Sequence, residues 1–202
     1  MVAQRNAEQT REKILLATFE IIYRHGFQGM RVEQVLKATN LAKGALYHHF
    51  KGKQALGYAV VEEVLMTDVN NRWIEPLSHC DDPLIGIKQI LDNECAAVPD
   101  EMLSLGCPLN NISQEMAGID DGFKERLMTI YTAWNDGIET ALADGITKGY
   151  VRADVKPQIT AAFIISAMQG IIGTVKCVQD KPMMIALKDE LVSYIMNLRA
   201  IN

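Results

Sequence analysis

Apolar residues recur every three or four positions through most of the chain, and this spacing gathers them on one face of an α-helix. The first run lies near the N-terminus, with inward positions at Ile14, Leu15, Thr18, Ile21 and Ile22. Thr10 carries a hydroxyl that can cap the start of this helix. Gly26 is suited to end it, because glycine adopts the left-handed backbone of a helix C-terminus. The pattern predicts a first helix over about 10–25.

Two shorter helical repeats follow, at about 31–38 and 42–49. Leu46 and Phe50 lie four apart, on one face of the second repeat. The three residues between the repeats centre on Asn40 and allow only a tight turn, since asparagine tolerates positive φ. Two short helices about a tight turn, packed on a longer helix, are typical of a helix-turn-helix, which places its second helix in the major groove of DNA.

The rest of the chain keeps the helical repeat. A long amphipathic helix is predicted to begin near Lys53, with Leu56 and Val60 on its inner side. Glycine and proline then separate further predicted helices at about 83–97, 102–116, 121–149, 157–180 and 182–200, and the second of these is expected to be interrupted near 106–108. There is no alternating strand pattern and no internal repeat. We therefore expect an all-α fold of about nine helices, with a helix-turn-helix domain at residues 1–52 and a second helical domain at residues 53–202.

The net charge of −5 hides an asymmetry along the chain. Residues 1–55 hold nine Lys or Arg against four Asp or Glu, so this part carries +5 and the remainder −10. A basic head on an acidic body indicates that only the head meets a polyanion such as nucleic acid. Chance clustering of charge on a solvated face is the alternative, and charge alone does not decide between the two.

The cysteines and the hydropathy of the chain indicate the cellular compartment in which the protein is expected. The four cysteines are widely spaced, form no CxxC pair and are expected to be reduced thiols: Cys80, Cys95, Cys107 and Cys177. The first residues are mostly polar and charged, so no signal peptide is expected. The most apolar stretch, 161–173, is interrupted by Ser166 and Gln169 and is too short to span a bilayer. We expect a cytoplasmic protein without a membrane segment.

Motifs of catalysis are absent from the sequence. There is no GxSxG, Walker loop, HExxH or dinucleotide fingerprint. Cys107 with His79 or Asp121 is the one imaginable nucleophilic arrangement, but such cysteines more often only pack. His48 and His49 are unsuited to share a metal, because adjacent helical residues point about 100° apart. The expectation is a protein that is not an enzyme and has no cofactor or metal.

The stretch from Ala38 to Phe50 reads ATNLAKGALYHHF and closely resembles the second half of the TetR-family helix-turn-helix. Gly26 with Phe27, the helix at 32–36 and Lys53 match the same family, so the resemblance covers roughly residues 9–60. It implies a homodimeric transcriptional regulator, most plainly a repressor, that binds a palindromic double-stranded DNA operator. It also implies that residues 53–202 bind a small-molecule effector and dimerise.

Small residues at the start of a recognition helix permit close approach to the major groove, and cations beside them suit phosphates. The expected DNA-binding residues are Arg31, Thr39, Lys43, Gly44, Ala45, Tyr47, His48 and Lys53. The chain departs from the family at two of its positions. Ala42 stands where Ser or Thr commonly caps the helix, a loss of about 1 kcal/mol. Arg31 lies near a position where the family commonly has Thr. Its longer, charged side chain is expected to replace the phosphate contact of that threonine.

The segment 106–116 is unusual for a core helix, because uncharged amides stand among its apolar residues and buried amides need partners. The expected ligand-binding residues, on this segment and the next helix, are Cys107, Asn110, Asn111, Gln114, Leu127, Tyr131 and Trp134. The Gly-Cys-Pro run resembles one branch of the family in which some members sense electrophiles or oxidants through a cysteine. Non-covalent sensing, thiol sensing through Cys107 and an inert Cys107 all stay open.

The last two predicted helices carry the residues expected to dimerise. The first has small residues at Ala161, Ala162, Ala167, Gly170 and Gly173, and the second an apolar stripe at Leu187, Leu191, Tyr194, Ile195 and Leu198. Either stripe can instead bury core within one chain. A DNA-binding architectural protein without a ligand is a further alternative, but the long acidic remainder argues against it. Effector, operator and the direction of regulation stay open.

Overall fold

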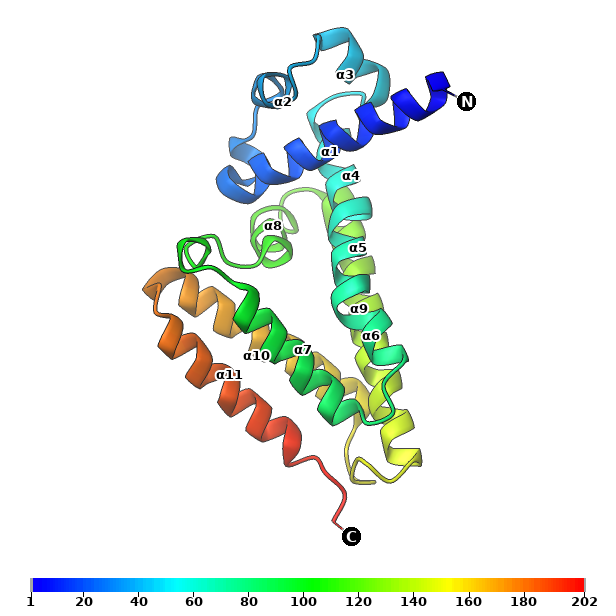
Figure 1. The fold of residues 1–202 in the computed structure, drawn as a ribbon, viewed down its shortest axis with the longest axis vertical. Coiled ribbons are helices and arrows are strands. Elements are labelled where there is room, and N and C mark those ends of the chain that lie inside the picture. Colours follow the sequence, from blue (N-terminus) through cyan, green and yellow to red (C-terminus); the bar gives the residue numbers. More distant parts are fainter. Residues whose placement is uncertain (1, 202) are drawn as a thin grey trace. The chain divides into compact units, whose positions relative to one another are not determined.

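The computed structural model describes residues 2–201, with side chains from residue 6 onward. Helices make up nearly all of its regular structure, and the only β pairing in this part of the chain is an isolated bridge between Val151 and Arg199 (Figure 1). The all-α prediction is confirmed.

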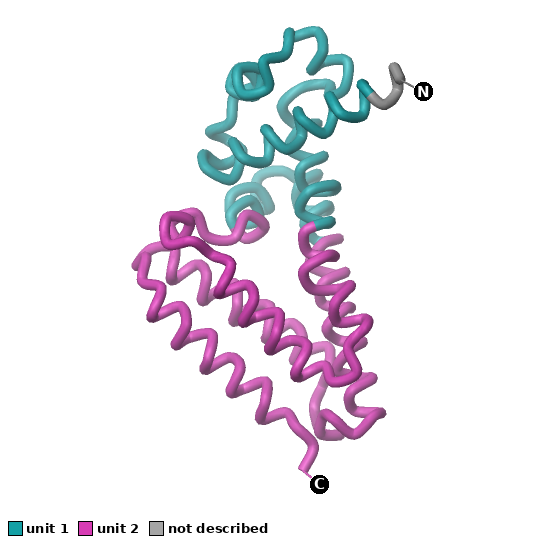
Figure 2. Tube along the Cα trace, in the orientation of Figure 1, with its two compact units in different colours: residues 1–67, 111–128 teal, residues 68–110, 129–202 magenta. Residues whose placement is uncertain are grey.

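The chain divides into two compact units that do not follow one boundary in sequence (Figure 2). The head unit consists of residues 1–67 and 111–128, and the body unit of residues 68–110 and 129–202. This division differs from the expected boundary between residues 52 and 53, because the start of the long helix and the distant segment 111–128 pack with the N-terminal helices.

The helix-turn-helix lies in the head unit. Its helices are α1 (Val2–Gly29), α2 (Val32–Thr39), α3 (Lys43–His49) and α4 (Lys53–Ala59), and α4 continues as a π-helical turn, η1 (Val60–Leu65). Both α2 and α3 pack on α1. The core between them consists of buried apolar side chains from each helix: Ile14, Leu15, Ile22, Phe27, Val35, Leu46, Phe50 and Leu56.

Local backbone geometry explains the ends of these helices. Gly26 (φ +73°) kinks α1, and Asn40 (φ +53°) ends α2 while its N–H donates to the carbonyl of Leu36. The expected start of α1 at Thr10 is wrong. The helix begins at Val2 because no glycine or proline precedes Thr10, whose hydroxyl donates to the carbonyl of Asn6 (2.8 Å) within the helix.

The remaining helices lie wholly or partly in the body unit, with parts of α5, α8 and α9 in the head unit: α5 (Met66–Val69), η2 (Asn70–Ile74), α6 (Glu75–Ser78), α7 (Pro83–Ala97), η3 (Asp100–Met102), α8 (Pro108–Met116), α9 (Asp121–Thr147), α10 (Pro157–Val178) and α11 (Lys181–Met196). Helix α11 packs against both α7 and α10 (Figure 1). A buried cluster of Cys95, Leu103, Val175 and Met184 joins these elements.

Two expectations about the middle of the chain are modified. The interruption predicted near 106–108 is present, and the α-helix of this segment lies only after it, starting at Pro108, because Gly106 (φ +71°) and a proline at the first position set a new helix start. The helix from Lys53 is not regular throughout, since η1 and η2 are π-helical. π-Helical turns are rare and often occur at functional sites.

Helix α10 is longer than the apolar stretch 161–173 that the sequence singled out. By length and composition it is the one described helix able to cross a membrane, and 33% of its most apolar window is buried. A single apolar helix of this kind does not by itself indicate a membrane protein.

Candidate DNA-binding interface and ligand-binding residues

The first turns of α3 present an open, polar surface. Lys43, Gly44, Tyr47 and His48 are exposed, whereas Leu46 on the opposite face is fully buried. A Cβ at Gly44 would meet nothing within 4 Å, so the backbone there is accessible. The Lys43 ammonium lies 5.7 Å from the centre of the Tyr47 ring, an arrangement that orients both side chains on one face. This surface can approach a groove of DNA closely.

Thr39 does not belong to this surface, in contrast to the sequence expectation. Its side chain is 1% exposed, and its hydroxyl donates to the carbonyl of Val35 (2.8 Å). The Thr39 carbonyl accepts from the Lys13 ammonium (2.7 Å), which thereby holds the turn from α1. Thr39 is therefore structural, because its polar atoms are used within the head unit.

Two further expected DNA-binding residues differ in place and exposure: Arg31 lies before α2, and Ala45 lies within α3. Arg31 is the exposed residue before α2, and its N–H donates to Oε1 of Gln34 (2.7 Å). The backbone of Arg31 thus takes part in capping α2, which leaves the guanidinium on the surface for an anion. Ala45 is half-buried. Ala42 precedes α3 without a side-chain cap bond, as expected of alanine.

Lys53 opens α4 and is half-buried. Its ammonium donates to the carbonyl of Gln28 (2.9 Å) and lies 4.9 Å from the centre of the Phe27 ring. An ammonium has three donors, so a phosphate contact remains compatible with this position.

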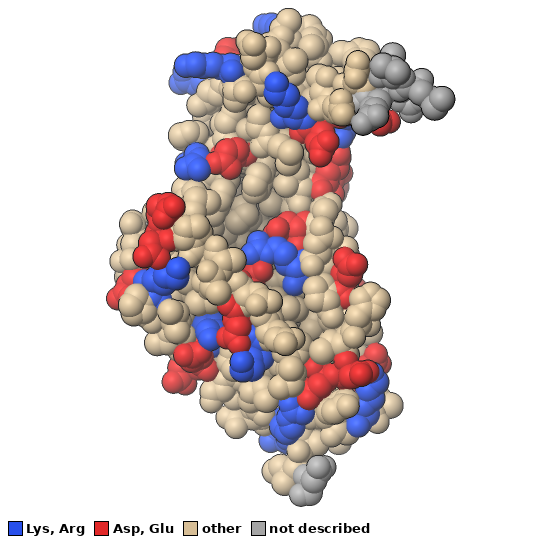
Figure 3. All heavy atoms as spheres, in the orientation of Figure 1, with Lys and Arg blue, Asp and Glu red and all other residues tan. Residues whose placement is uncertain are grey.

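Acidic and basic side chains are interspersed over the body unit on the face drawn in Figure 3. Many of these charges are paired, as in Arg72 with Asp68 and Glu94, and Lys188 with Asp92. Such pairs balance charge locally on the body unit.

The seven expected ligand-binding residues fall in both compact units. Asn111, Gln114 and Leu127 belong to the head unit, where Leu127 is buried and Gln114 is exposed. The others belong to the body unit: Cys107, Asn110, Tyr131 and Trp134.

Within the body unit, Cys107 lies beside a residue that the sequence expectation missed. The Gln169 amide nitrogen is 3.6 Å from the Cys107 sulfur, and Gln169 is 8% exposed. Its Oε1 has no hydrogen-bond partner among the described residues. The only sequence signal was a polar amide within the most apolar stretch of the chain. Burying an amide there without a hydrogen-bond partner costs free energy.

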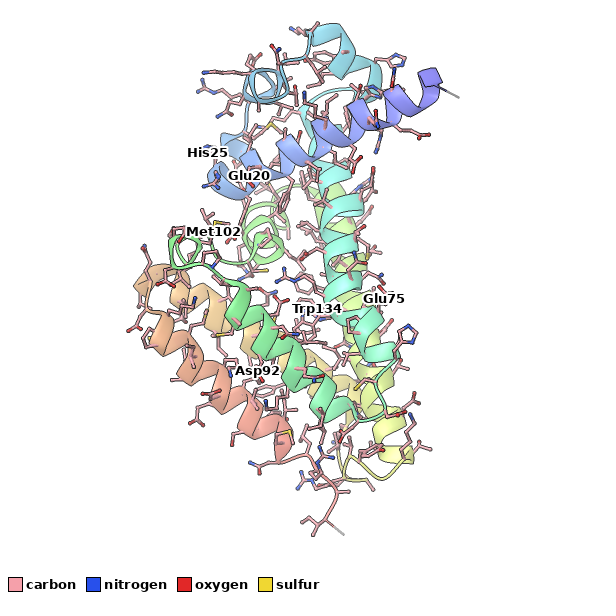
Figure 4. All side chains as sticks on the ribbon, in the orientation of Figure 1. Glu20, His25, Glu75, Asp92, Met102 and Trp134 are labelled. Carbon is pink, nitrogen blue, oxygen red and sulfur yellow. The ribbon has the colours of Figure 1, made fainter. Side chains whose placement is uncertain are left out.

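Trp134 is a second buried polar group of the body unit (Figure 4). It is 2% exposed, and its indole Nε1 has no acceptor among the residues described. The Trp73 ring packs edge-on against the Trp134 ring, with 5.2 Å between the ring centres, and the centre of the Tyr131 ring lies 6.4 Å from that of Trp134. The surroundings of Trp134 are thus aromatic, with one N–H donor left to satisfy.

The thiol-sensing alternative is not favoured. Burial raises the pKa of the Cys107 thiol, and hydrogen bonds from the Asn110 backbone and the Gln169 side chain offset this only in part. A reactive cysteine needs the opposite shift, because the thiolate is the nucleophile.

The body unit also contains a surface cavity of about 290 Å³. It is lined by Asn71, Arg72, Pro76, Cys80, Gly86, Gln89, Ile90, Asn93 and Glu94. None of the expected ligand-binding residues lines it.

Comparison with known proteins agrees with this arrangement. Residues 14–60 match the model of bacterial regulatory proteins of the tetR family, and residues 83–188 match the tetracyclin repressor-like C-terminal domain. The chain is 27% identical over 153 residues to the HTH-type transcriptional repressor DhaR of Mycobacterium sp. strain GP1, covering 76% of this chain and 75% of that protein.

Solved structures show the same fold. A TetR transcriptional regulator from Chloroflexus aurantiacus superposes with a TM-score of 0.85 at 23% identity, covering 98% of this chain and all (100%) of that one. The reduced form of Escherichia coli NemR superposes with a TM-score of 0.81 at 18% identity, covering 95% of this chain and 97% of that one. With an N-terminal and a C-terminal family domain both matched, the chain belongs to the TetR family of transcriptional regulators.

Proposed function

We propose that the protein is a ligand-responsive repressor, which binds a palindromic operator as a cytoplasmic homodimer and is released by a small-molecule effector. The observation that carries the DNA-binding part is the open surface at the start of α3, where Lys43, Gly44 and Tyr47 are exposed above a buried Leu46. Seven residues are proposed to meet DNA: Arg31, Lys43, Gly44, Ala45, Tyr47, His48 and Lys53.

Dimerisation is supported by apolar side chains that one chain leaves uncovered. On α10, Ile159 is 64% and Phe163 48% exposed, and the Phe163 ring packs on Tyr194 of α11 at 4.8 Å. Gly170, on the same face, has nothing within 4 Å of a Cβ position. A second copy would cover this surface, since two α10 and two α11 helices can pair about a twofold axis. Ala161, Leu191, Ile195 and Leu198 are instead buried within the chain.

Effector binding is supported by the two unsatisfied polar groups of the body unit. The Trp134 N–H needs an acceptor, and one end of the Gln169 amide needs a partner whichever way the amide is oriented. A bound molecule with a hydroxyl group can supply either partner, because a hydroxyl both accepts from an N–H and donates to an amide oxygen. We therefore propose Gln169 as a ligand-binding residue beside Cys107, Asn110, Tyr131 and Trp134, with Asn111, Gln114 and Leu127 kept as sequence-based candidates.

Footprinting of the purified protein on the DNA flanking its own gene tests the proposal. We expect protection of an inverted repeat with half-site centres one helical turn, or a multiple, apart. Adding a small-molecule cell extract should then release the protein. A lack of any protected site would refute the DNA-binding role. Protection that no extract or small molecule alters would instead point to an architectural protein without an effector.

A further inference from the structure

The kink at the end of α1 creates backbone amides that need an acceptor from elsewhere. Gly26 (φ +73°) interrupts the helix, so a new turn begins with Phe27 and Gln28. The first N–H groups of such a turn have no carbonyl partner within it. Met30 closes the turn by donating to the carbonyls of Gly26 (3.1 Å) and Phe27 (3.2 Å).

Glu115 of α8 supplies the missing acceptors, although it is more than eighty residues away in sequence. Its Oε2 accepts from the Phe27 N–H (2.8 Å) and its Oε1 from the Gln28 N–H (2.7 Å). All three residues lie in the head unit. A Cβ at position 26 would come within 2.9 Å of both carboxylate oxygens, so glycine is needed there for this approach as well as for its φ.

Lys53 is held by the same two residues that Glu115 holds. Its ammonium donates to the Gln28 carbonyl and lies over the Phe27 ring. Phe27 and Gln28 are therefore fixed by a carboxylate at their N–H groups and by an ammonium at the ring and carbonyl. Bonds to a charged acceptor are the stronger class of hydrogen bond, so the carboxylate contributes substantially to the order of this turn.

We propose that Glu115 is a positioning residue for DNA binding, which fixes the turn at residues 26–28 and so holds the Lys53 ammonium where it meets a phosphate. The inference rests on the proposed DNA-binding function and adds to the helix-turn-helix a residue from outside it. A purely electrostatic role and a positioning role of Glu115 predict opposite changes in DNA affinity when its carboxylate is removed. A carboxylate near DNA repels it, so by charge alone its removal should strengthen binding. If Glu115 acts by positioning, its removal should weaken binding.

Binding of the full-length protein to a fluorescent random-sequence duplex shows whether Kd rises or falls. Such a duplex is suitable because phosphate contacts do not depend on base sequence. Glu115→Gln is expected to raise Kd about three- to tenfold, a weakening that corresponds to one impaired charge-assisted hydrogen bond. Glu115→Ala should raise Kd further, because glutamine keeps one acceptor oxygen. Asp121→Asn is the matched control, since it removes one charge from an exposed position of the same unit. Its Kd should stay unchanged or fall slightly.

A double-mutant cycle with Lys53→Gln distinguishes positioning from general damage to the head. If Glu115 acts through Lys53, Glu115→Gln should change Kd by less than about 1.5-fold in the Lys53→Gln background. Amide exchange at Phe27 and Gln28 should also quicken in Glu115→Gln, while amides within α2 keep their protection.

Two results would overturn the inference and leave the proposed function intact. One is Glu115→Gln binding the duplex as tightly as the wild type or more tightly. The other is an equal loss with and without Lys53, which would mean that the variant damages the fold. Failure of the wild-type protein to bind either the duplex or its own flanking DNA would instead overturn the proposed function, and this inference with it.

Discussion

At the scale of single residues, the exposed side chains of α3 are where the proposed interaction with DNA is most directly tested. Lys43 and Tyr47 have no part in the buried core, and the two lie together on the surface. Lys43→Ala and Tyr47→Ala should each cost about 1–3 kcal/mol of operator binding, or roughly five- to 150-fold in Kd. Gel-shift titration measures the loss. Melting temperatures should stay at the wild-type value, and unchanged binding in both variants would contradict the assignment of this surface.

Cys107 is expected to be an unreactive thiol at neutral pH. Burial raises its pKa, so the thiolate that attacks an alkylating agent is scarce until the pH rises well above neutrality. Alkylation by iodoacetamide at pH 7.5, followed by peptide mass spectrometry, should be at least about tenfold slower than that of glutathione in the same solution. An equal rate would show that the thiol is accessible and ionised in solution.

At the scale of elements, two glycines on neighbouring helices should respond to alanine in opposite ways. A Cβ on Gly57 of α4 would lie 2.4 Å from the Phe27 ring and 2.6 Å from the Phe123 ring, both in the head core. Gly57→Ala should therefore destabilise the protein by about 1–3 kcal/mol, since a packed core resists extra volume. Urea unfolding measures this change.

Gly44→Ala is the matched comparison, because a Cβ there meets nothing within 4 Å. Alanine is the better helix former by about 1 kcal/mol, so this variant should be at least as stable as the wild type. Its operator affinity should nevertheless fall, because the added methyl group stands at the surface proposed to approach DNA. A stability loss as large as that of Gly57→Ala would contradict the packing described for α3.

At the scale of the whole molecule, the uncovered face of α10 predicts the oligomeric state. Phe163→Glu should convert the proposed dimer to a monomer at micromolar concentration, because it places a charge in the apolar contact with no partner. Sedimentation velocity measures this. Met128→Glu is the control, since Met128 is a 60% exposed apolar residue outside α10 and α11. A wild-type protein that sediments as a monomer would refute the dimer itself.

The sequence by itself determined the all-α fold, the helix-turn-helix and the placement of Lys43, Gly44 and Tyr47 on an exposed surface. These features depend on residues close together in the chain: helical periodicity, a glycine or asparagine at positive φ, and small residues opening a short helix. The resemblance to the TetR family rested on the same local pattern and was confirmed by the family domains at residues 14–60 and 83–188.

Only the tertiary structure decided the contacts between distant residues. Glu115 bonds to a turn more than eighty residues away, and Gln169 meets Cys107 across 62 residues. Neither pair leaves a periodic signal in the sequence. The burial of Thr39 was likewise hidden, because a threonine beside a turn suits a surface as well as a core. The units interleave for the same physical reason: packing joins residues 111–128 to the head through contacts made in space, whereas sequence patterns report only neighbours along the chain.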